Sequence, residues 1–317
     1  MVAKRLSDLA FTELSYANAA DPRLKRWFIR SVEGLSGRDR YAALYDLWRR
    51  NIAPTGERVF GRMLELVDIG VRREGQWPPT DLQDGPLVIV ANHPFGIGDG
   101  IAILSLAEQL GRPFRVMIAS ELLKIPEMAA YSLPVDFSET KEALKNNIAV
   151  RHEAVRLLKD GVVIVIFPAG GVATAPKGFG AARDLPWKMF PARLVQDARA
   201  SVVPMYFSGQ NGRLFHLVSR PMALAAHEHR LARMVGKAAL ALRLSLLVRE
   251  FARLSGRSIG VRIGETLHWH QLEPLRDRKA LLETLHDAVF RLAPPAATHR
   301  RRAIARFRRN NSGMKAA

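Results

Sequence analysis

Apolar and polar positions follow different rhythms in two parts of this chain. Residues 1–68 carry apolar side chains at helical spacing, with Arg and Lys between them, and Asp21-Pro22 places an acidic N-cap before a proline at the first helical position. From residue 69 onward, short β-rich runs appear instead. The pattern predicts an N-terminal helical layer followed by a domain that contains strands.

The strand-like runs lie at 69–73, 87–91, 114–119, 162–167, 202–207 and 259–263. Two of them, LVIVA at 87–91 and VVIVIF at 162–167, are apolar without interruption, which is typical of strands buried on both faces. Helix-like segments separate most of the runs, most clearly residues 141–159. This alternation favours an α/β fold with a mainly parallel central sheet flanked by helices.

The end of the chain is strongly basic. From Arg291 onward there is no acidic residue, Pro294-Pro295 marks a break, and arginines cluster between residues 300 and 309. We therefore divide the chain into a helical region (1–68), an α/β domain (69–292) and a basic, flexible tail (293–317). The tail is either solvated or an electrostatic anchor on anionic lipid, where each Arg contributes up to about 1 kcal/mol.

Residues 230–254 form a basic and strongly apolar helix candidate. Its centre, AALALRLSLLV, has eleven residues and is too short to span a bilayer. Contact with a membrane surface and ordinary packing on the core both fit this segment. No longer apolar run occurs, and charges interrupt the first residues of the chain, so we expect neither a membrane-spanning helix nor a signal peptide.

The charge of the chain bears on its partners rather than on its fold. The 48 Lys and Arg residues against 30 Asp and Glu residues give a net charge of +18. Such a charge attracts anionic surfaces, whether nucleic acid, phospholipid headgroups or acidic carrier proteins. No motif that binds DNA or RNA can be placed on the sequence, so no specific nucleic-acid partner is expected.

Cysteine and histidine usage limits the possible metal and redox chemistry. The absence of cysteine excludes disulfides, thiolate metal sites and cysteine nucleophiles, and it fits a reducing cytosol. The pairs His227/His229 and His268/His270 do not resemble a metal site, because residues i and i+2 do not share a helix face and zinc needs three or four convergent ligands. We expect no bound metal.

The stretch ANHPFGIGDG, residues 91–100, carries the first candidate chemistry. Ligands of open α/β sheets bind at the carboxyl ends of strands, and Asn92 and His93 directly follow the strand predicted at 87–91. Pro94 and the glycines permit a sharp turn that brings Asp99 back to His93. A carboxylate on one imidazole nitrogen fixes the tautomer and leaves the other nitrogen free to accept a proton. We interpret the pair as a general base; a structural histidine that anchors a loop is the alternative.

A second block, IFPAGGVATAPKG at 166–178, ends the next buried run. There too an apolar run stops at a proline and glycines, which the parallel sheet would place at the same edge. Gly170 and Gly171 expose backbone N–H groups that could bind a phosphate or an oxyanion. A simple glycine turn is the alternative.

Together the two blocks resemble the glycerolipid acyltransferase superfamily, most closely its lysophospholipid or hemolysin-like acyltransferase subgroup. NHPFGIGDG matches the N-H-x-x-x-x-D block of the superfamily with one extra residue before the Asp, as in that subgroup, and FPAGGVA stands where the superfamily has F-P-E-G-x-x-S. Matching stretches also occur at 122–128, 202–215 and 262–267, so the resemblance covers about residues 60–270.

The resemblance implies an enzyme that transfers a fatty acyl group from acyl-CoA or acyl carrier protein to a lyso-lipid, without a cofactor. The protein would be cytoplasmic and peripherally associated with the anionic surface of the inner membrane. His93 would be the base and Asp99 its orienting partner. The residues assigned to substrate binding are Asn92, Phe167, Pro168, Gly170, Gly171 and Lys177.

Three positions depart from the superfamily pattern. Ala169 replaces the carboxylate, Val172 replaces the basic residue of enzymes that act on glycerol phosphates, and Ala173 replaces the serine. The acceptor must then be bound differently, with Lys177 or Arg183 as candidate cations. This favours a lyso-aminolipid, such as lyso-ornithine lipid, or another lyso-phospholipid over lysophosphatidate. A catalytically silent lipid-binding relative and, from the charge alone, a nucleic-acid-binding protein are the competing hypotheses.

Overall fold

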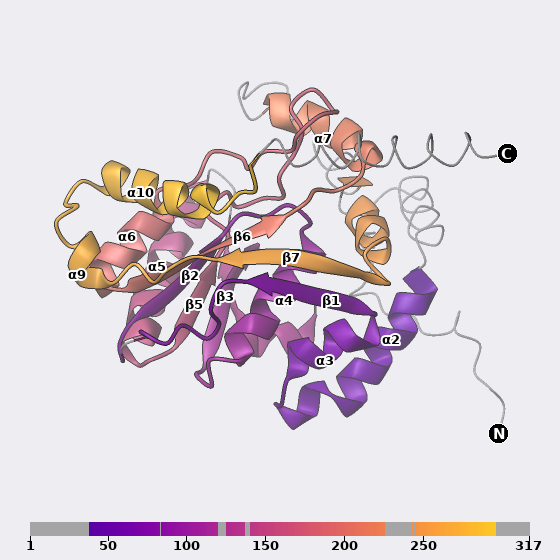
Figure 1. Cartoon of the computed structure of the whole chain (residues 1–317), viewed down its shortest axis with the longest axis horizontal. Coiled ribbons are helices and arrows are strands. Elements are labelled where there is room, and N and C mark those ends of the chain that lie inside the picture. Colours follow the sequence, from indigo (N-terminus) through magenta and orange to yellow (C-terminus); the bar gives the residue numbers. More distant parts are fainter. Residues whose placement is uncertain are drawn as a thin grey trace, which may run out of the picture.

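The structure, a computed structural model, describes residues 38–82, 84–119, 125–136, 140–225, 242–243 and 245–295. Within them, seven strands form one sheet in the order β1-β7-β6-β2-β5-β3-β4 (Figure 1). Each pair of neighbours from β6 to β4 is parallel, β1 is parallel to β7, and only the β6–β7 pair is antiparallel. The predicted α/β fold with a mainly parallel sheet is therefore confirmed.

The strands lie close to the runs that the sequence predicts, with one addition. β4 was not predicted, because its sequence SLPV is short and contains a proline, which only an edge strand tolerates readily. The strands are β1 Ile69–Glu74, β2 Leu87–Ala91, β3 Phe114–Ala119, β4 Ser132–Val135, β5 Val163–Ile166, β6 Ser201–Ser208 and β7 Arg257–Ile263.

Helices cover both faces of the sheet, and β2 lies at its centre with every residue buried (Figure 1). Alternate side chains of a strand point to opposite faces, so Ile89 joins the core beneath α2, α3 and α4, whereas Val88 and Val90 join the core beneath α5, α6 and α10. The helices of the first layer are α2 Arg38–Asn51, α3 Val59–Leu66 and α4 Ile97–Glu108. Those of the second are α5 Lys141–Lys159, α6 Phe190–Ala198 and α10 Arg278–Arg291.

Four further helical elements are described outside these two layers. They are the helix α7 Arg213–Ala225, the single-turn α9 Trp269–Leu272 and the 3-10 helices η3 Ala53–Thr55 and η5 Pro126–Tyr131. Among the helices that the structure describes, none has both the length and the apolar character needed to cross a membrane.

The N-terminal helical layer packs on the sheet where it is described. Trp48 of α2 is 1% exposed and belongs to the same core as β1 and β2. Its indole Nε1 donates to the Val59 carbonyl oxygen at 2.9 Å, which joins α2 to the start of α3. Residues 1–37 lie outside the described residues, as do 230–241 of the apolar helix candidate and 296–317 of the basic tail. The predictions for these segments stay predictions.

Candidate active site

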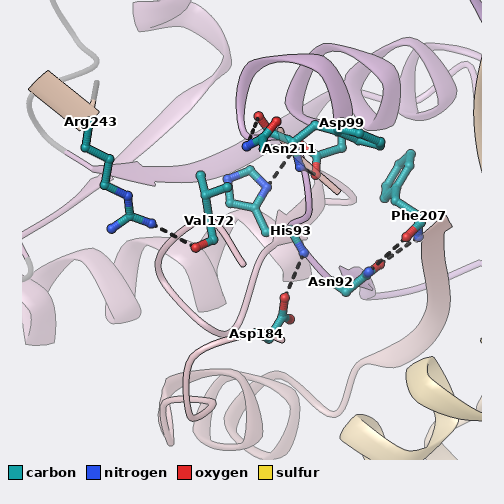
Figure 2. Close-up of polar contacts among 9 residues, drawn as sticks. Asn92, His93, Asp99, Val172, Asp184, Phe207, Asn211 and Arg243 are labelled. Atoms are coloured by element: carbon teal, nitrogen blue, oxygen red, sulfur yellow. Dashed lines mark hydrogen bonds and ion pairs between the residues drawn. The ribbon is translucent and has the colours of Figure 1, made fainter. Parts of the chain in front are cut away.

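A buried amide fixes the chain where it leaves β2. Asn92, the first residue after β2, is 5% exposed. Its Nδ2 donates to the Phe207 carbonyl oxygen at 3.0 Å, and its Oδ1 accepts from the Phe207 N–H at 2.6 Å (Figure 2). The side chain thus extends the pairing of β2 with β6. Both polar ends of the amide are bonded to backbone, which gives Asn92 a positioning role. The assignment of Asn92 to substrate binding stays a prediction.

Gly96 and Gly98 allow other segments to pack closely on the first turn of α4. Gly96 has a φ of 84°, and a Cβ there would lie 3.0 Å from Val172 Cγ2. At Gly98 a Cβ would lie 2.5 Å from Leu254 Cδ1. Side chains at these positions would therefore push away the loop after β5 and the turn before β7. The glycines serve this close approach as well as the turn that the sequence predicts.

Asp99 lies in the first turn of α4 and is fully buried. Its Oδ2 accepts a hydrogen bond from the Phe95 N–H at 2.9 Å, which holds the carboxylate against the backbone of the turn. The N-terminal end of a helix also favours a negative charge. The other oxygen, Oδ1, is 3.2 Å from Nδ1 of His93 (Figure 2). The turn therefore brings the two residues together as the sequence predicts.

The side chain of His93 contacts Phe167 and Asp99 and remains partly exposed. Its ring stacks on Phe167, with ring centres 4.0 Å apart and planes inclined by 28°. The contact of Nδ1 with Asp99 is an ion-pair contact without good hydrogen-bond alignment, a geometry that often tightens only when substrate binds. The side chain keeps 17% exposure, and Nε2 has no hydrogen-bond partner among the described residues. This nitrogen is available to a substrate.

A second carboxylate, which the sequence analysis missed, supports the backbone of His93. Asp184 Oδ1 accepts from the His93 N–H at 3.2 Å (Figure 2). Its Oδ2 accepts from Trp187 Nε1 at 3.1 Å. Burial raises the pKa of Asp184, although these two hydrogen bonds work in the opposite direction. The sequence signal would have been an acid three residues before a Trp, which is too common a pattern to identify a site.

The second block lies beside the first. The Ala173 N–H donates to the His93 carbonyl oxygen at 2.8 Å. Gly170 turns the chain with a φ of 65°, and its N–H donates to the Phe167 carbonyl oxygen at 3.0 Å. Among the described residues, no group accepts from the N–H of Gly171 or Val172. The N–H of Gly170, which we predicted to be available to an oxyanion, is therefore bonded within the turn, whereas that of Gly171 has no described acceptor.

The remaining residues of this block have other surroundings. Pro168 is buried, and its carbonyl oxygen accepts from the Lys188 N–H at 3.0 Å. Lys177 is exposed, and no described contact joins it to His93. Arg183 pairs with Thr174 through its backbone. The cation that does contact the loop is Arg243, whose Nη2 donates to the Val172 carbonyl oxygen at 2.8 Å.

Of the two histidine pairs considered for metal binding, one lies within the described residues. His268 caps α9, and its Nε2 lies 3.0 Å from Asp81 Oδ2. Its ring stacks on that of His270. Within the described parts of the chain, no three metal-binding side chains are grouped together. His227 and His229 lie outside the described residues.

Comparisons with known proteins find a family model and curated relatives that are similar to this chain. The family model described as Acyltransferase matches residues 71–208, a range that contains β2, the His93–Asp99 turn and the loop after β5. A lyso-glycine lipid O-acyltransferase of Phocaeicola vulgatus is 21% identical over 216 residues, 66% of this chain and 69% of that protein. The lyso-glycine lipid O-acyltransferase of Bacteroides thetaiotaomicron is 22% identical over 219 residues, 66% and 71% of the two chains.

A solved structure also aligns with most of the chain. The crystal structure of the 1-acyl-sn-glycerophosphate acyltransferase PlsC from Thermotoga maritima matches 84% of this chain and 88% of its own, with 18% identity and a TM-score of 0.43. The family match and the curated relatives agree with the two sequence blocks that meet at His93. The family model and the two curated relatives support membership of the glycerolipid acyltransferase superfamily for this chain.

Proposed function

We propose that this protein transfers a fatty acyl group from a thioester to the hydroxyl of a lyso-lipid, with His93 as general base and Asp99 as its orienting partner. One observation carries the proposal. The imidazole presents Nδ1 to a fully buried carboxylate at 3.2 Å, while Nε2 is free of described partners at the edge of a parallel sheet, where ligands of such folds bind. The names of the two curated relatives support the acceptor class.

The reaction follows from this geometry. His93 Nε2 accepts the proton of the acceptor hydroxyl while the hydroxyl oxygen attacks the thioester carbonyl carbon. The tetrahedral intermediate then expels the thiolate as the C–S bond breaks, and the thiolate takes the proton from the imidazolium. The products are an ester and a free thiol. Asp99 stabilises the imidazolium, and the N–H groups of Gly171 and Val172 supply donors for the oxyanion.

We infer an acceptor whose headgroup is an amino acid rather than a glycerol phosphate. Val172 offers no charge where enzymes acting on glycerol phosphates have a basic residue. An amino acid that is bound to a lipid through its amine keeps one carboxylate, a smaller and singly charged anion. A lyso-glycine lipid, the acceptor in the names of the curated relatives, is the first acceptor to test.

We also propose that the enzyme works at the cytoplasmic face of an anionic membrane and takes its acyl group from acyl-CoA or acyl carrier protein. The net charge of +18 suits the lipid surface and both donors. Phe179, Leu214 and Leu217 are 65%, 44% and 52% exposed, and Lys177 beside them is exposed as well. Exposed apolar side chains next to a cation are a composition that lipid surfaces attract.

The test measures thiol release with purified protein, an acyl-CoA and a panel of lyso-lipids. A thiol reagent detects only the released CoA, because the protein has no cysteine of its own. We expect turnover by the wild type and, in His93→Ala, a fall of at least about 100-fold, the lower end of general-base contributions. His152→Ala, at an exposed histidine of α5, is the matched control and should keep wild-type activity.

The competing hypotheses have distinct outcomes. Retained turnover in His93→Ala would contradict the assignment of the base. Vesicle binding without turnover by the wild type on the whole panel would indicate a silent lipid-binding relative. Salt-dependent binding to DNA without binding to anionic vesicles would favour the nucleic-acid hypothesis.

A further inference from the structure

Arg243 brings a positive charge to the loop after β5 from a distant part of the chain. Its Nη2 donates to the Val172 carbonyl oxygen at 2.8 Å and lies 3.5 Å from Thr174 Oγ1 (Figure 2). The next residue after Val172, Ala173, donates its N–H to the His93 carbonyl oxygen at 2.8 Å. The guanidinium is therefore attached to the same loop segment that is bonded to the candidate base.

Among the described residues, the surroundings of this guanidinium are largely apolar and contain no counter-ion. Its central carbon lies 5.4 Å from the centre of the Phe215 ring, and Phe215 packs with Val172, Leu246 and Leu247 in one buried cluster. Burial lowers the pKa of Arg243, and no described carboxylate offsets it. Buried charges in proteins are normally paired. A partly buried cation without a described anionic partner suggests that the anion comes from outside the chain.

The guanidinium also keeps donors for such an anion. An arginine has five N–H donors, and the contacts with Val172 and Thr174 use Nη2 alone. Nε and Nη1 have no acceptor among the described residues, and neither is among the enclosed atoms that lack a partner. Two neighbouring N–H groups of an arginine can donate two parallel hydrogen bonds to the two oxygens of one carboxylate.

We propose that Arg243 binds the carboxylate of the acceptor headgroup while the acceptor hydroxyl lies at His93. This inference rests on the proposed function and names the residue that selects its substrate. Arg243 supplies the charge that Val172 lacks, and it does so from a distant segment of the chain, through the carbonyl oxygen of Val172 itself. Neither Lys177 nor Arg183 is then needed for this role.

The surroundings favour the acceptor over the donor as the source of the anion. A guanidinium over the Phe215 ring suits one singly charged carboxylate next to an alkyl chain. The phosphates of CoA carry several charges and need several cations with access to water. The exposed basic surface of the chain meets that need better than this apolar site does.

The test compares two acceptors that differ only in the headgroup charge, an N-(hydroxyacyl)glycine and its methyl ester. We expect the wild type to prefer the free acid in kcat/KM by about ten- to 150-fold, the range for a hydrogen-bonded charge. In Arg243→Gln this preference should fall to about one, with the ester used as by the wild type. Arg253→Gln, at an arginine of the same segment that is 53% exposed, is the control and should keep the preference.

Each other outcome contradicts the inference. An unchanged acid preference in Arg243→Gln, or a raised KM for acyl-CoA alone, would remove Arg243 from the acceptor site. Equal use of acid and ester by the wild type would do so even if the glutamine variant fails to fold. Arg243→Lys, which keeps the charge but not the paired geometry, should retain part of the preference.

Failure of the proposed function would look different. If the wild type turns over neither acceptor, calorimetric binding of the N-(hydroxyacyl)glycine to wild type and Arg243→Gln still tests the inference. Weaker binding of the acid by the variant, with no difference for the ester, would support Arg243 as the headgroup site in a protein with another activity. Conversely, His93→Ala should lose turnover of both acceptors while its binding preference for the acid remains.

Discussion

Replacing Asp99 with Asn separates the orienting role of this residue from its structural role. The Asn side-chain oxygen can still accept the Phe95 N–H that Asp99 Oδ2 accepts at 2.9 Å. In the wild type, Asp99 Oδ1 lies 3.2 Å from Nδ1 of His93. In the variant, the amide N–H₂ of the Asn takes the place of this oxygen. That donor selects the imidazole tautomer with the proton on Nε2. The nitrogen that should accept the hydroxyl proton is thereby blocked.

The expected loss follows from the two roles. Loss of general-base catalysis costs about 100- to 10,000-fold in kcat, whereas loss of the charge at the start of α4 costs about 0.3–1 kcal/mol of stability. Asp99→Asn should therefore lose at least about 100-fold in kcat with KM for the lyso-lipid nearly unchanged. Its urea unfolding midpoint should correspond to a stability within about 1 kcal/mol of the wild type.

The assay is thiol release from acyl-CoA over a range of lyso-lipid concentrations, with urea unfolding measured on the same preparations. A kcat within tenfold of the wild type would refute the reasoning, because the tautomer of His93 would then not matter. A large loss of stability would show that the carboxylate mainly holds the turn.

Two further predictions concern the residues that support His93. Asn92→Leu should lower the free energy of unfolding by about 2–6 kcal/mol, because it leaves the buried N–H and C=O of Phe207 unsatisfied at about 1–3 kcal/mol each. An unchanged urea midpoint together with a raised KM for the acceptor would instead indicate that Asn92 binds substrate. Burial raises the pKa of Asp184 above its usual 3.8. Between pH 3.8 and the folded-state pKa, the folded state therefore holds a proton that the unfolded state releases. Because of this difference, Asp184 lowers the free energy of unfolding as the pH rises through that range. Urea unfolding at several pH values in this range should therefore show that the stability of Asp184→Asn, relative to that of the wild type, increases with pH. A stability difference that does not change with pH would contradict the role of burial.

The sequence predicts the centre of this fold well because burial dominates there. LVIVA at 87–91 and VVIVIF at 162–167 are apolar throughout, and they became the buried central strands β2 and β5. The turn from His93 to Asp99 is also a local feature, so its spacing sufficed to predict their contact. β4 was missed because a short edge strand containing Pro134 has no apolar run of its own.

What the sequence could not supply are contacts between distant segments. Asp184 bonds to the backbone N–H of His93 across 91 residues. Almost every residue has a backbone N–H, so the residue types do not reveal this contact. Arg243 reaches the carbonyl oxygen of Val172 across 71 residues, so sequence reasoning looked for the missing cation among neighbours such as Lys177. The bonds of Asn92 to Phe207 span 115 residues, so the sequence did not reveal them.

The central claim is that the imidazole of His93 removes a proton from a lyso-lipid hydroxyl. Single-turnover acyl transfer to an N-(hydroxyacyl)glycine, with enzyme in excess over acyl-CoA, measures that step without product release. The account predicts a rate for His93→Ala at least about 100-fold below the wild type, with an unchanged unfolding midpoint. A His93→Ala rate equal to that of the wild type would contradict it.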